Sequence, residues 1–358
     1  MGQTHLGVRC VYWQCCGLDA SDNAVLDGAM TDKSEKFLVF AGMRNEGAFI
    51  VEWVSWYRAM GFDVLVGVND CTDHSPALLQ RLAEEGWVQW FTHKPREGQP
   101  PKASAHAAMR AQPAVAATDW LLICDADEFL VVHQGDGSIG GFLDGMGRDF
   151  LGMAFHWQCY GNSGWQRYAP GLTHRQFMRC GAGQRQVNAM FKTLFRDPLR
   201  YRKYSDHSPF EFDGTWGEGT NVIVDSEHRV IDKFQTEPHP IRYSTVEQIT
   251  HRNAQMNHYI IRSDEHFDLK RGTKSASAFK DRYTDQFYRA RNRNGMKDAS
   301  ALAWAARFDP VYAEAMTLPG VARLHHLCCA DYVARLIAPK GGRPQDDPRW
   351  QAHMAAAG

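Results

Sequence analysis

Four short apolar runs, separated by segments of helical periodicity, constrain the fold of the first part of this chain. The runs cover residues 37–43, 64–68, 87–91 and 120–124. Consecutive apolar residues are typical of strands that are buried on both faces, and helices between such strands predict a parallel sheet. We therefore expect an α/β fold in which a mostly parallel, Rossmann-like sheet is flanked by helices.

Beyond residue 150 the pattern is looser and predicts short strands followed by helices. We expect a main domain over residues 37–275 and a helical C-terminal region over residues 276–340. A flexible tail is expected over residues 341–358, which are rich in Gly, Pro and charge. Residues 1–36 have weak periodicity and are expected to form an N-terminal extension.

The charge and the cysteines of the chain argue against several classes of protein. The 40 Lys and Arg nearly balance the 41 Asp and Glu, so the net charge of −1 does not favour nucleic acid as a partner. No apolar run is long enough to span a membrane, and the first residues do not have the pattern of a secretory signal. The nine cysteines, an odd number, are typical of reduced thiols. These features predict a cytoplasmic protein.

Polar side chains follow three of the predicted strands, at the point where each strand ends. The segments are Arg44-Asn45-Glu46, Asn69-Asp70 and Asp125-Ala126-Asp127. The carboxyl ends of parallel strands meet at one edge of the sheet, where such folds bind ligands. Clustered carboxylates repel one another, and a bound divalent cation is the usual remedy. The sequence predicts a site for a metal ion and phosphates at this edge; a solvated turn is the alternative for the two aspartates.

In their order along the chain, these and later motifs resemble those of the family 2-like and family 92 glycosyltransferases, which have the GT-A fold. The resemblance covers roughly residues 37–275. The motifs lie at residues 43–47, 52–53, 69–73, 119–120, 125–130, 191–196, 207–209, 257–259 and 263–272. One position departs from the family pattern, because Pro101-Lys102 stands where the family has Pro-Gln.

The resemblance implies a nucleotide-sugar site that contains a divalent metal ion. Asp125 and Asp127 would ligate Mn²⁺ or Mg²⁺, which prefer hard oxygen ligands, and His207 would complete the metal site. Lys270 is a weaker candidate for a contact with the pyrophosphate. The residues expected to bind the donor are Arg44, Asn45, Glu46, Asn69, Asp70, Asp73, Lys102, Asp125, Lys192 and His258.

Two of these donor-binding residues have structural alternatives. Asp73 is explained equally well as a helix cap, and Glu46 as a first-turn residue that complements a helix dipole.

The function expected from this resemblance is that of a metal-dependent inverting glycosyltransferase, which transfers a sugar from a UDP-sugar to a glycan or glycolipid acceptor. The expected context is cell-surface polysaccharide or lipopolysaccharide synthesis, with peripheral membrane association through the acceptor. The candidate base is Glu218, a carboxylate flanked by glycines, while Asp206, Glu211, Asp213 and Glu265 stay open. An exposed loop acid is the alternative interpretation of Glu218. The alternative function is a non-catalytic subunit that binds nucleotide-sugars or glycans in a polysaccharide assembly complex.

Overall fold

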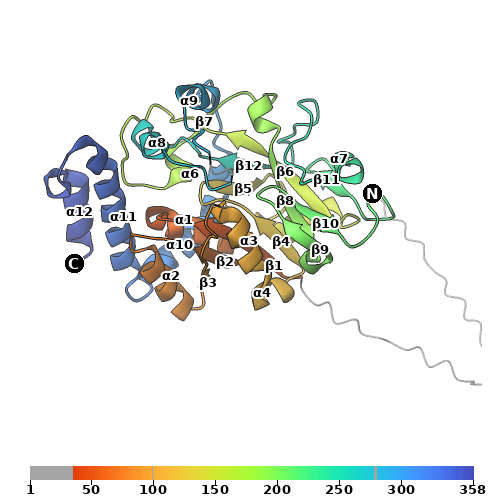
Figure 1. Cartoon of the computed structure of the whole chain (residues 1–358), viewed down its shortest axis with the longest axis horizontal. Coiled ribbons are helices and arrows are strands. Elements are labelled where there is room, and N and C mark those ends of the chain that lie inside the picture. The colour runs from red at the N-terminus through yellow and green to blue at the C-terminus, as the bar shows by residue number, and fades with distance from the viewer. Residues whose placement is uncertain (1–34, 99, 278–279) are drawn as a thin grey trace, which may run out of the picture. The chain divides into compact units, whose positions relative to one another are not determined.

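One sheet runs through the computed structural model, which describes residues 35–98, 100–277 and 280–358 (Figure 1). The strands lie in the order β3 (Gln89–Thr92), β2 (Phe62–Val68), β1 (Phe37–Met43), β4 (Trp120–Ile123), β8 (Phe191–Arg196), β6 (Gly152–Cys159), β12 (Ala254–His258) and β5 (Glu128–Val132), and β11 (Ile223–Asp225) pairs with β6. The expected N-terminal extension over residues 1–36 lies outside the described residues, apart from its last two.

The four strands predicted for the first part of the chain are confirmed, and they pair in parallel. β1 pairs with β2 and with β4, and β2 pairs with β3. They alternate with α1 (Gly47–Ala59), α2 (Ser75–Glu84), α3 (Pro101–Arg110) and α4 (Pro113–Ala116). Because these strands run in one direction, their carboxyl ends lie along one edge. The predicted α/β fold, a mostly parallel sheet flanked by helices, is confirmed.

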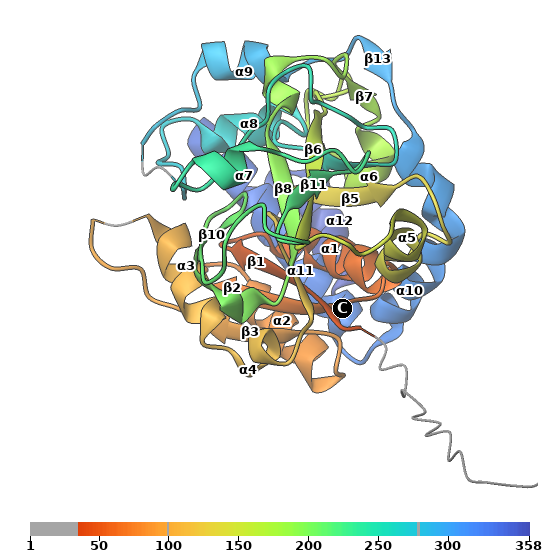
Figure 2. The same cartoon turned by 90° about the vertical axis from the view of Figure 1, so that its right-hand side faces the viewer.

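The sheet is mixed in its second half. β8 runs antiparallel to both β4 and β6, and β5 runs antiparallel to β12. In contrast, β6 pairs in parallel with β11 and β12. Figure 2 shows β6 and β8 side by side in the middle of the sheet. Since β4 ends at Ile123 and β5 begins at Glu128, the segment with Asp125 and Asp127 is a short connection held at both ends by strands.

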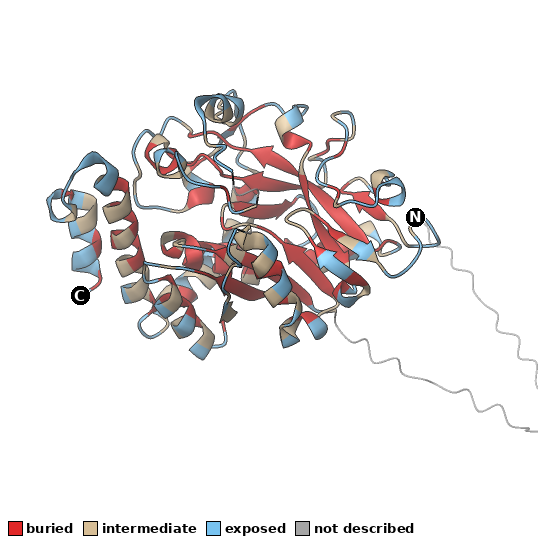
Figure 3. Ribbon diagram, viewed as in Figure 1, coloured by how far each residue is buried: buried red, intermediate tan, exposed pale blue. Residues whose placement is uncertain are grey.

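The two faces of β1 belong to separate apolar clusters, and the C-terminal helices complete one of them. Val39 packs in the cluster that α1 covers, whereas Phe40 packs on the opposite face with residues of α3. Phe308 of α10 (Ala305–Thr317) and Val321 of α11 (Val321–Ile337) join the cluster of Val39. The central strands, such as β1, β4 and β6, are buried on both sides (Figure 3). The expected helical C-terminal region therefore shares its core with the sheet.

The remaining elements are short, and one of them follows its sequence signals closely. Ser263 stands before α8 (Asp264–Lys270), as its residue type favours, and its side chain accepts a hydrogen bond from the His266 N–H as an N-cap. The other helices are α5 (Ile139–Met146), α6 (Thr173–Gln176), α7 (Lys233–Thr236) and α9 (Asp285–Arg291), with 3₁₀ turns at Gln186–Asn188, Pro198–Arg200, Ser300–Trp304, Ala338–Lys340 and Pro344–Asp346. The other strands are β7 (Arg179–Cys180), β9 (Tyr201–Tyr204), β10 (Pro209–Phe212) and β13 (Met296–Lys297).

The segment 341–358 differs from the expected flexible tail, because half of it forms α12 (Pro348–Ala356). The Asp347 side chain caps this helix at the Arg349 N–H, 2.9 Å away, and His353 is buried. Arg349 also pairs with the buried Glu265 at 2.6 Å. These contacts fix α12 against the rest of the chain. Within the part of the chain that the structure describes, no helix is long and apolar enough to cross a membrane.

Candidate functional site

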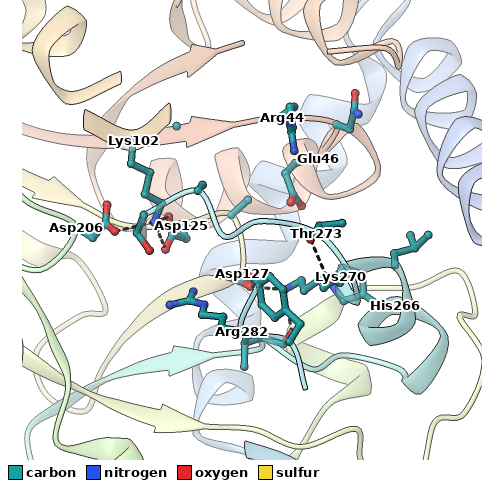
Figure 4. Close-up of a pocket in the computed structure, with 18 of the residues that line it drawn as sticks. Arg44, Glu46, Lys102, Asp125, Asp127, Asp206, His266, Lys270, Thr273 and Arg282 are labelled. Carbon is teal, nitrogen blue, oxygen red and sulfur yellow. Dashed lines mark hydrogen bonds and ion pairs between the residues drawn. The ribbon is translucent and has the colours of Figure 1, made fainter. Parts of the chain in front are cut away.

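A cavity of about 510 Å³ opens at the carboxyl ends of β1, β2 and β4. The segments that follow these strands supply Arg44, Asp70 and Asp125 to its lining, and the segment around α8 and α9 supplies Lys270 and Arg282 from the facing side. Figure 4 shows Arg44, Asp125, Lys270 and Arg282 around one space. The predicted convergence of the strand ends therefore produces a real cavity.

Most of the site residues predicted from the sequence line this cavity. They are Arg44, Asn45, Glu46, Asp70, Lys102, Asp125, Asp127, His207 and His258. Four predicted residues are not part of the lining: Asn69, Asp73, Lys192 and Glu218.

Asn45 and Asp73 hold two strand ends together. The Asn45 side-chain oxygen accepts hydrogen bonds from the Thr72 N–H at 2.7 Å and from the Asp73 N–H at 3.3 Å. Asp73 in turn accepts from the Ser75 N–H at 3.0 Å and from the Gly47 N–H at 3.2 Å, at the starts of α2 and α1. Since these contacts use its carboxylate on backbone groups, the geometry favours the helix-capping alternative for Asp73.

Asp70 and Glu46 present carboxylates to the cavity beside these ties. Asp70 has a left-handed backbone with φ of 46°, and its carboxylate accepts a hydrogen bond from the Asn69 amide at 3.0 Å. Glu46 lies 3.5 Å from the guanidinium of Arg262, and burial raises its pKa more than Arg262 lowers it. Asn69 thus acts on the cavity indirectly, by orienting Asp70.

Asp125 is held by lysines. The ammonium group of Lys102 lies 2.6 Å and 2.8 Å from its two carboxylate oxygens, and that of Lys192 lies 3.5 Å away. Burial alone would raise the pKa of Asp125, but Lys102 and Lys192 outweigh it and hold the pKa well below the usual range. Asp125 is therefore an ionised carboxylate that already has cationic partners.

Asp127 has a similar environment on the other side of the turn. The Lys270 ammonium lies 3.3 Å from one carboxylate oxygen, and Nε2 of His258 lies 3.7 Å from the other. Burial would raise the pKa of Asp127, but Lys270, His258 and Arg262 lower it to about 2. Figure 4 shows Lys102 beside Asp125 and Lys270 beside Asp127, as two separate pairs.

Lys192, predicted to contact the donor, lies beneath the cavity and is not part of its lining. Its side chain is 1% exposed and its ammonium group lies 2.9 Å from the carboxylate of Glu128. It also donates a hydrogen bond to the Asp206 carbonyl at 2.7 Å. Burial would lower the pKa of Lys192, but Asp125 and Glu128 outweigh it and raise the pKa. Lys192 therefore acts on a ligand through Asp125 and the shape of the turn.

Two neutral histidines complete the floor of the cavity. Burial, together with nearby lysines, lowers the pKa of both His207 and His258 to about 3. Nδ1 of His207 lies 2.8 Å from the Phe191 carbonyl and donates to it. The His258 ring packs on Trp157, with ring centroids 4.1 Å apart, and its Nδ1 has no hydrogen-bond partner within the described residues.

The arrangement of these groups does not fit a divalent metal ion. Within residues 35–98, 100–277 and 280–358, no group of three or more His, Cys, Asp or Glu side chains is placed to hold one. A cation between Asp125 and Asp127 would have to displace two ammonium groups. A metal-ligating histidine normally donates its second ring N–H to a partner; His207 does so to the Phe191 carbonyl, whereas His258, the histidine beside Asp127, has no such partner within the described residues. Mn²⁺ or Mg²⁺ thus stays a prediction from the clustered carboxylates and the resemblance.

Glu218 does not lie in the cavity. It is exposed in a turn that follows Trp216, and Trp216 packs on Phe212 with ring centroids 4.6 Å apart. The Trp216 ring beside Glu218 is thus used in an internal contact. Of the other carboxylates considered for the base, Asp206 lines the cavity, 3.3 Å from Lys102.

Several lining residues were not anticipated from the sequence. Arg282 and Tyr283 precede α9, and Arg335 belongs to α11, where it donates to the Asn45 carbonyl at 2.9 Å. All three follow residue 275, beyond the motifs of the resemblance. Their basic and aromatic character was visible, but their position depends on how the C-terminal region folds back over the sheet.

Comparisons with known proteins give the following results. No protein-family model matches the sequence. No curated protein matches it. Among solved structures, the chain is similar to S. aureus TarS in complex with UDP, with 15% identity, 46% of this chain and 47% of that chain covered, and a TM-score of 0.29. For TarS 1–349 in complex with UDP-GlcNAc the identity is 12%, with 90% of this chain and 91% of that chain covered and a TM-score of 0.34.

The mannosyltransferase Ktr4p from S. cerevisiae has 10% identity, with 40% of this chain and 44% of that chain covered and a TM-score of 0.24. The chain spans about half the length of the first of the structures named here.

Proposed function

We propose that this chain is a glycosyltransferase that transfers a sugar from a nucleoside-diphosphate sugar, in the first place a UDP-sugar, to a hydroxyl group of a glycan acceptor. The observation that carries the proposal is the excess of cations in a cavity at the carboxyl ends of parallel strands. The cationic side chains among the described lining residues are Arg44, Lys102, Lys270, Lys274, Arg282, Arg291 and Arg335, and the carboxylates are Glu46, Asp70, Asp125, Asp127 and Asp206.

This excess supports binding of a diphosphate. The whole chain carries a net charge of −1, so positive charge is gathered at this cavity rather than spread over the protein. Lys and Arg side chains donate charge-assisted hydrogen bonds to phosphate oxygens. Carboxylates at the rim, such as those of Asp70 and Glu46, are suited to accept hydrogen bonds from ribose hydroxyls or a base N–H. A nucleoside diphosphate presents both kinds of group.

The chemistry proposed is displacement at the anomeric carbon with inversion of configuration. An ionised carboxylate takes the proton of the acceptor hydroxyl, which attacks the sugar as the nucleoside diphosphate leaves. Asp206 is the candidate for this base because it lines the cavity, and it is ionised because Lys102 and His106 outweigh burial and lower its pKa. Cationic side chains stabilise the charge that develops on the leaving diphosphate.

The acceptor proposed is a glycan or glycolipid. Tyr283 and Phe287 line the cavity on the side of α9 and are the aromatic side chains proposed to contact a sugar. Synthesis of a cell-surface polysaccharide or lipopolysaccharide, in the cytoplasm and with membrane association through the acceptor, is part of the proposal and follows from the resemblance.

The test is release of nucleoside diphosphate from a panel of nucleotide-sugars, with and without glycan acceptors. We expect release from at least one donor, and Asp127→Asn is expected to lower the rate because Lys270 loses its charged partner. Asp149→Asn, at an exposed side chain on the surface, is the control. Tight binding of nucleotide-sugar with no turnover over the whole panel would favour the non-catalytic subunit instead.

A further inference from the structure

We propose that Lys102 and Lys270 take the place of a divalent metal ion at the donor, so that the diphosphate is bound and its charge neutralised without metal. This assignment rests on the proposed function, because it concerns the same donor. It contradicts the metal dependence that the Asp-x-Asp motif suggests. The reasons lie in the position, the exposure and the partners of the two lysines.

The two ammonium groups are fixed in place from opposite sides of the turn. Lys102 belongs to α3 and contacts Asp125 at 2.6 Å and Asp206 at 3.3 Å. Lys270 belongs to α8, contacts Asp127 at 3.3 Å and donates a hydrogen bond to the Ile260 carbonyl at 2.9 Å. Each lysine is held by two acceptors, so its charge is positioned before any ligand arrives.

Both lysines also face the space that a ligand would fill. Their side chains are 18% and 20% exposed, and both line the cavity, whereas Lys192 is 1% exposed beneath it. An ammonium group has three N–H donors, and each of these two lysines donates two hydrogen bonds within the protein. Each lysine can therefore bind a phosphate oxygen while it keeps a carboxylate partner. Lys192 supports Asp125 from below and is not itself a phosphate ligand.

A metal ion would be disfavoured by the same arrangement. A dication between Asp125 and Asp127 would lie next to two ammonium groups and would be repelled by them. It would also take the carboxylate oxygens that now accept hydrogen bonds from the two lysines. The imidazole nearest to Asp127, that of His258, has an Nδ1 without a hydrogen-bond partner within the described residues, and so is not oriented as metal ligands usually are. Two fixed monovalent cations provide the charge that one dication would bring.

The test is calorimetric titration of the metal-stripped full chain with UDP and, as a probe independent of the base, inorganic pyrophosphate. In excess EDTA we expect UDP affinity within about threefold of that measured with Mn²⁺, because the charge-assisted bonds come from lysine. Lys102→Gln should weaken UDP binding in EDTA by about tenfold or more, the usual effect of losing one charged hydrogen bond. Lys94→Gln, an exposed lysine before α3, is the control and should bind as the wild type does.

A second readout separates a ligand role from a structural one. In Lys102→Gln the carboxylate of Asp125 loses its lysine partner on the cavity side, so Mn²⁺ should now strengthen UDP binding although it has little effect on the wild type. Loss of UDP binding by the wild type in EDTA, or unchanged affinity in Lys102→Gln, would overturn the metal-free assignment and leave the proposed function in place. If neither UDP nor pyrophosphate binds with or without Mn²⁺, the donor site itself is wrong.

Discussion

The ammonium group of Lys192 lies 2.9 Å from the carboxylate of Glu128, and both side chains are closed off from solvent. Glu128 also accepts a hydrogen bond from the Asp125 N–H at 2.7 Å. This buried pair joins β8 to the start of β5 and so fixes the short connection that carries Asp125 and Asp127. The cavity depends on it for its shape, although neither residue lines it.

Removal of Lys192 is expected to destabilise the fold strongly. Lys192→Met removes the buried cation that faces Asp125 and Glu128, and loss of one partner from a buried ion pair typically costs about 3 to 5 kcal/mol. Lys203→Met is the matched control, because Lys203 pairs with Glu211 at 2.7 Å with 61% of its side chain exposed, and such pairs contribute about 1 kcal/mol or less. Urea unfolding measures both. Equal effects of the two substitutions would show that the buried pair does not hold the turn.

Substitutions of Glu218 and of Asp206 are expected to have different effects on kcat. Glu218→Gln should change kcat less than about twofold, since Glu218 lies in an exposed turn outside the cavity. Asp206→Asn should lower kcat by about 10²- to 10⁴-fold, the usual range for loss of a general base. Steady-state kinetics with the best donor and acceptor decide between them. A large loss in Glu218→Gln with normal Asp206→Asn would return the base to the residue predicted from the sequence.

The stability of the protein should decrease as the pH falls below neutral. Burial, together with His251 and Arg229, lowers the pKa of His156 from 6.5 to about 3. Its imidazole is neutral in the folded protein, whereas in the unfolded protein it takes up a proton below about pH 6.5. Its contribution to the free energy of unfolding is therefore complete above the unfolded pKa and is lost as the pH falls toward 3. Between pH 6.5 and 5 the loss amounts to about 2 kcal/mol, at 1.36 kcal/mol per pH unit.

The His156→Gln variant should therefore have a flatter dependence of unfolding free energy on pH by about that amount. His239→Gln, at an exposed position, should keep the slope of the wild type. Urea unfolding at a series of pH values gives both slopes, and an unchanged slope in His156→Gln would refute the buried neutral imidazole.

The docking of α12 should depend on Arg349. Its guanidinium pairs with Glu265 at 2.6 Å and with Asp347 at 2.8 Å, and its side chain is 13% exposed. Arg349→Ala removes two charged partners and should lower stability by about 1.5 to 3 kcal/mol. Arg343→Ala breaks the pair with Asp346, in which the Arg343 side chain is 78% exposed, and should lower stability by less than about 1 kcal/mol. Thermal unfolding compares the two, and limited proteolysis should cut the C-terminal segment faster only in Arg349→Ala.

The first half of the fold was predictable because its signals are local. The buried strand at residues 37–43 and the helix after it follow from the spacing of apolar residues, and the cap at Ser263 follows from one side chain and its neighbours. The tail was mispredicted because Gly and Pro residues near position 341 suggested disorder, whereas the helix depends on a tertiary pair between Arg349 and Glu265. Sequence spacing contains no information on such a pair.

The positions of the site residues were easier to predict from the sequence than the side chains that they contact. Strand-end positions such as Asp70 and Asp125 are fixed by the order of strands. The lysine contacts are not, because Lys102 is 23 residues from Asp125 and Lys270 is 143 residues from Asp127. One signal was visible in advance: Lys102 stands where the resembling family has Gln, which places a charge next to the first aspartate. Its consequence for the metal site became apparent only from the distances.

A crystal structure of the chain soaked with UDP and Mn²⁺ is the decisive measurement for this site. The expected result is a diphosphate in the cavity, with oxygens within hydrogen-bond distance of the ammonium groups of Lys102 and Lys270. A diphosphate bound away from both lysines, or a cavity without UDP at saturating concentration, would contradict the assignment of this cavity to the donor.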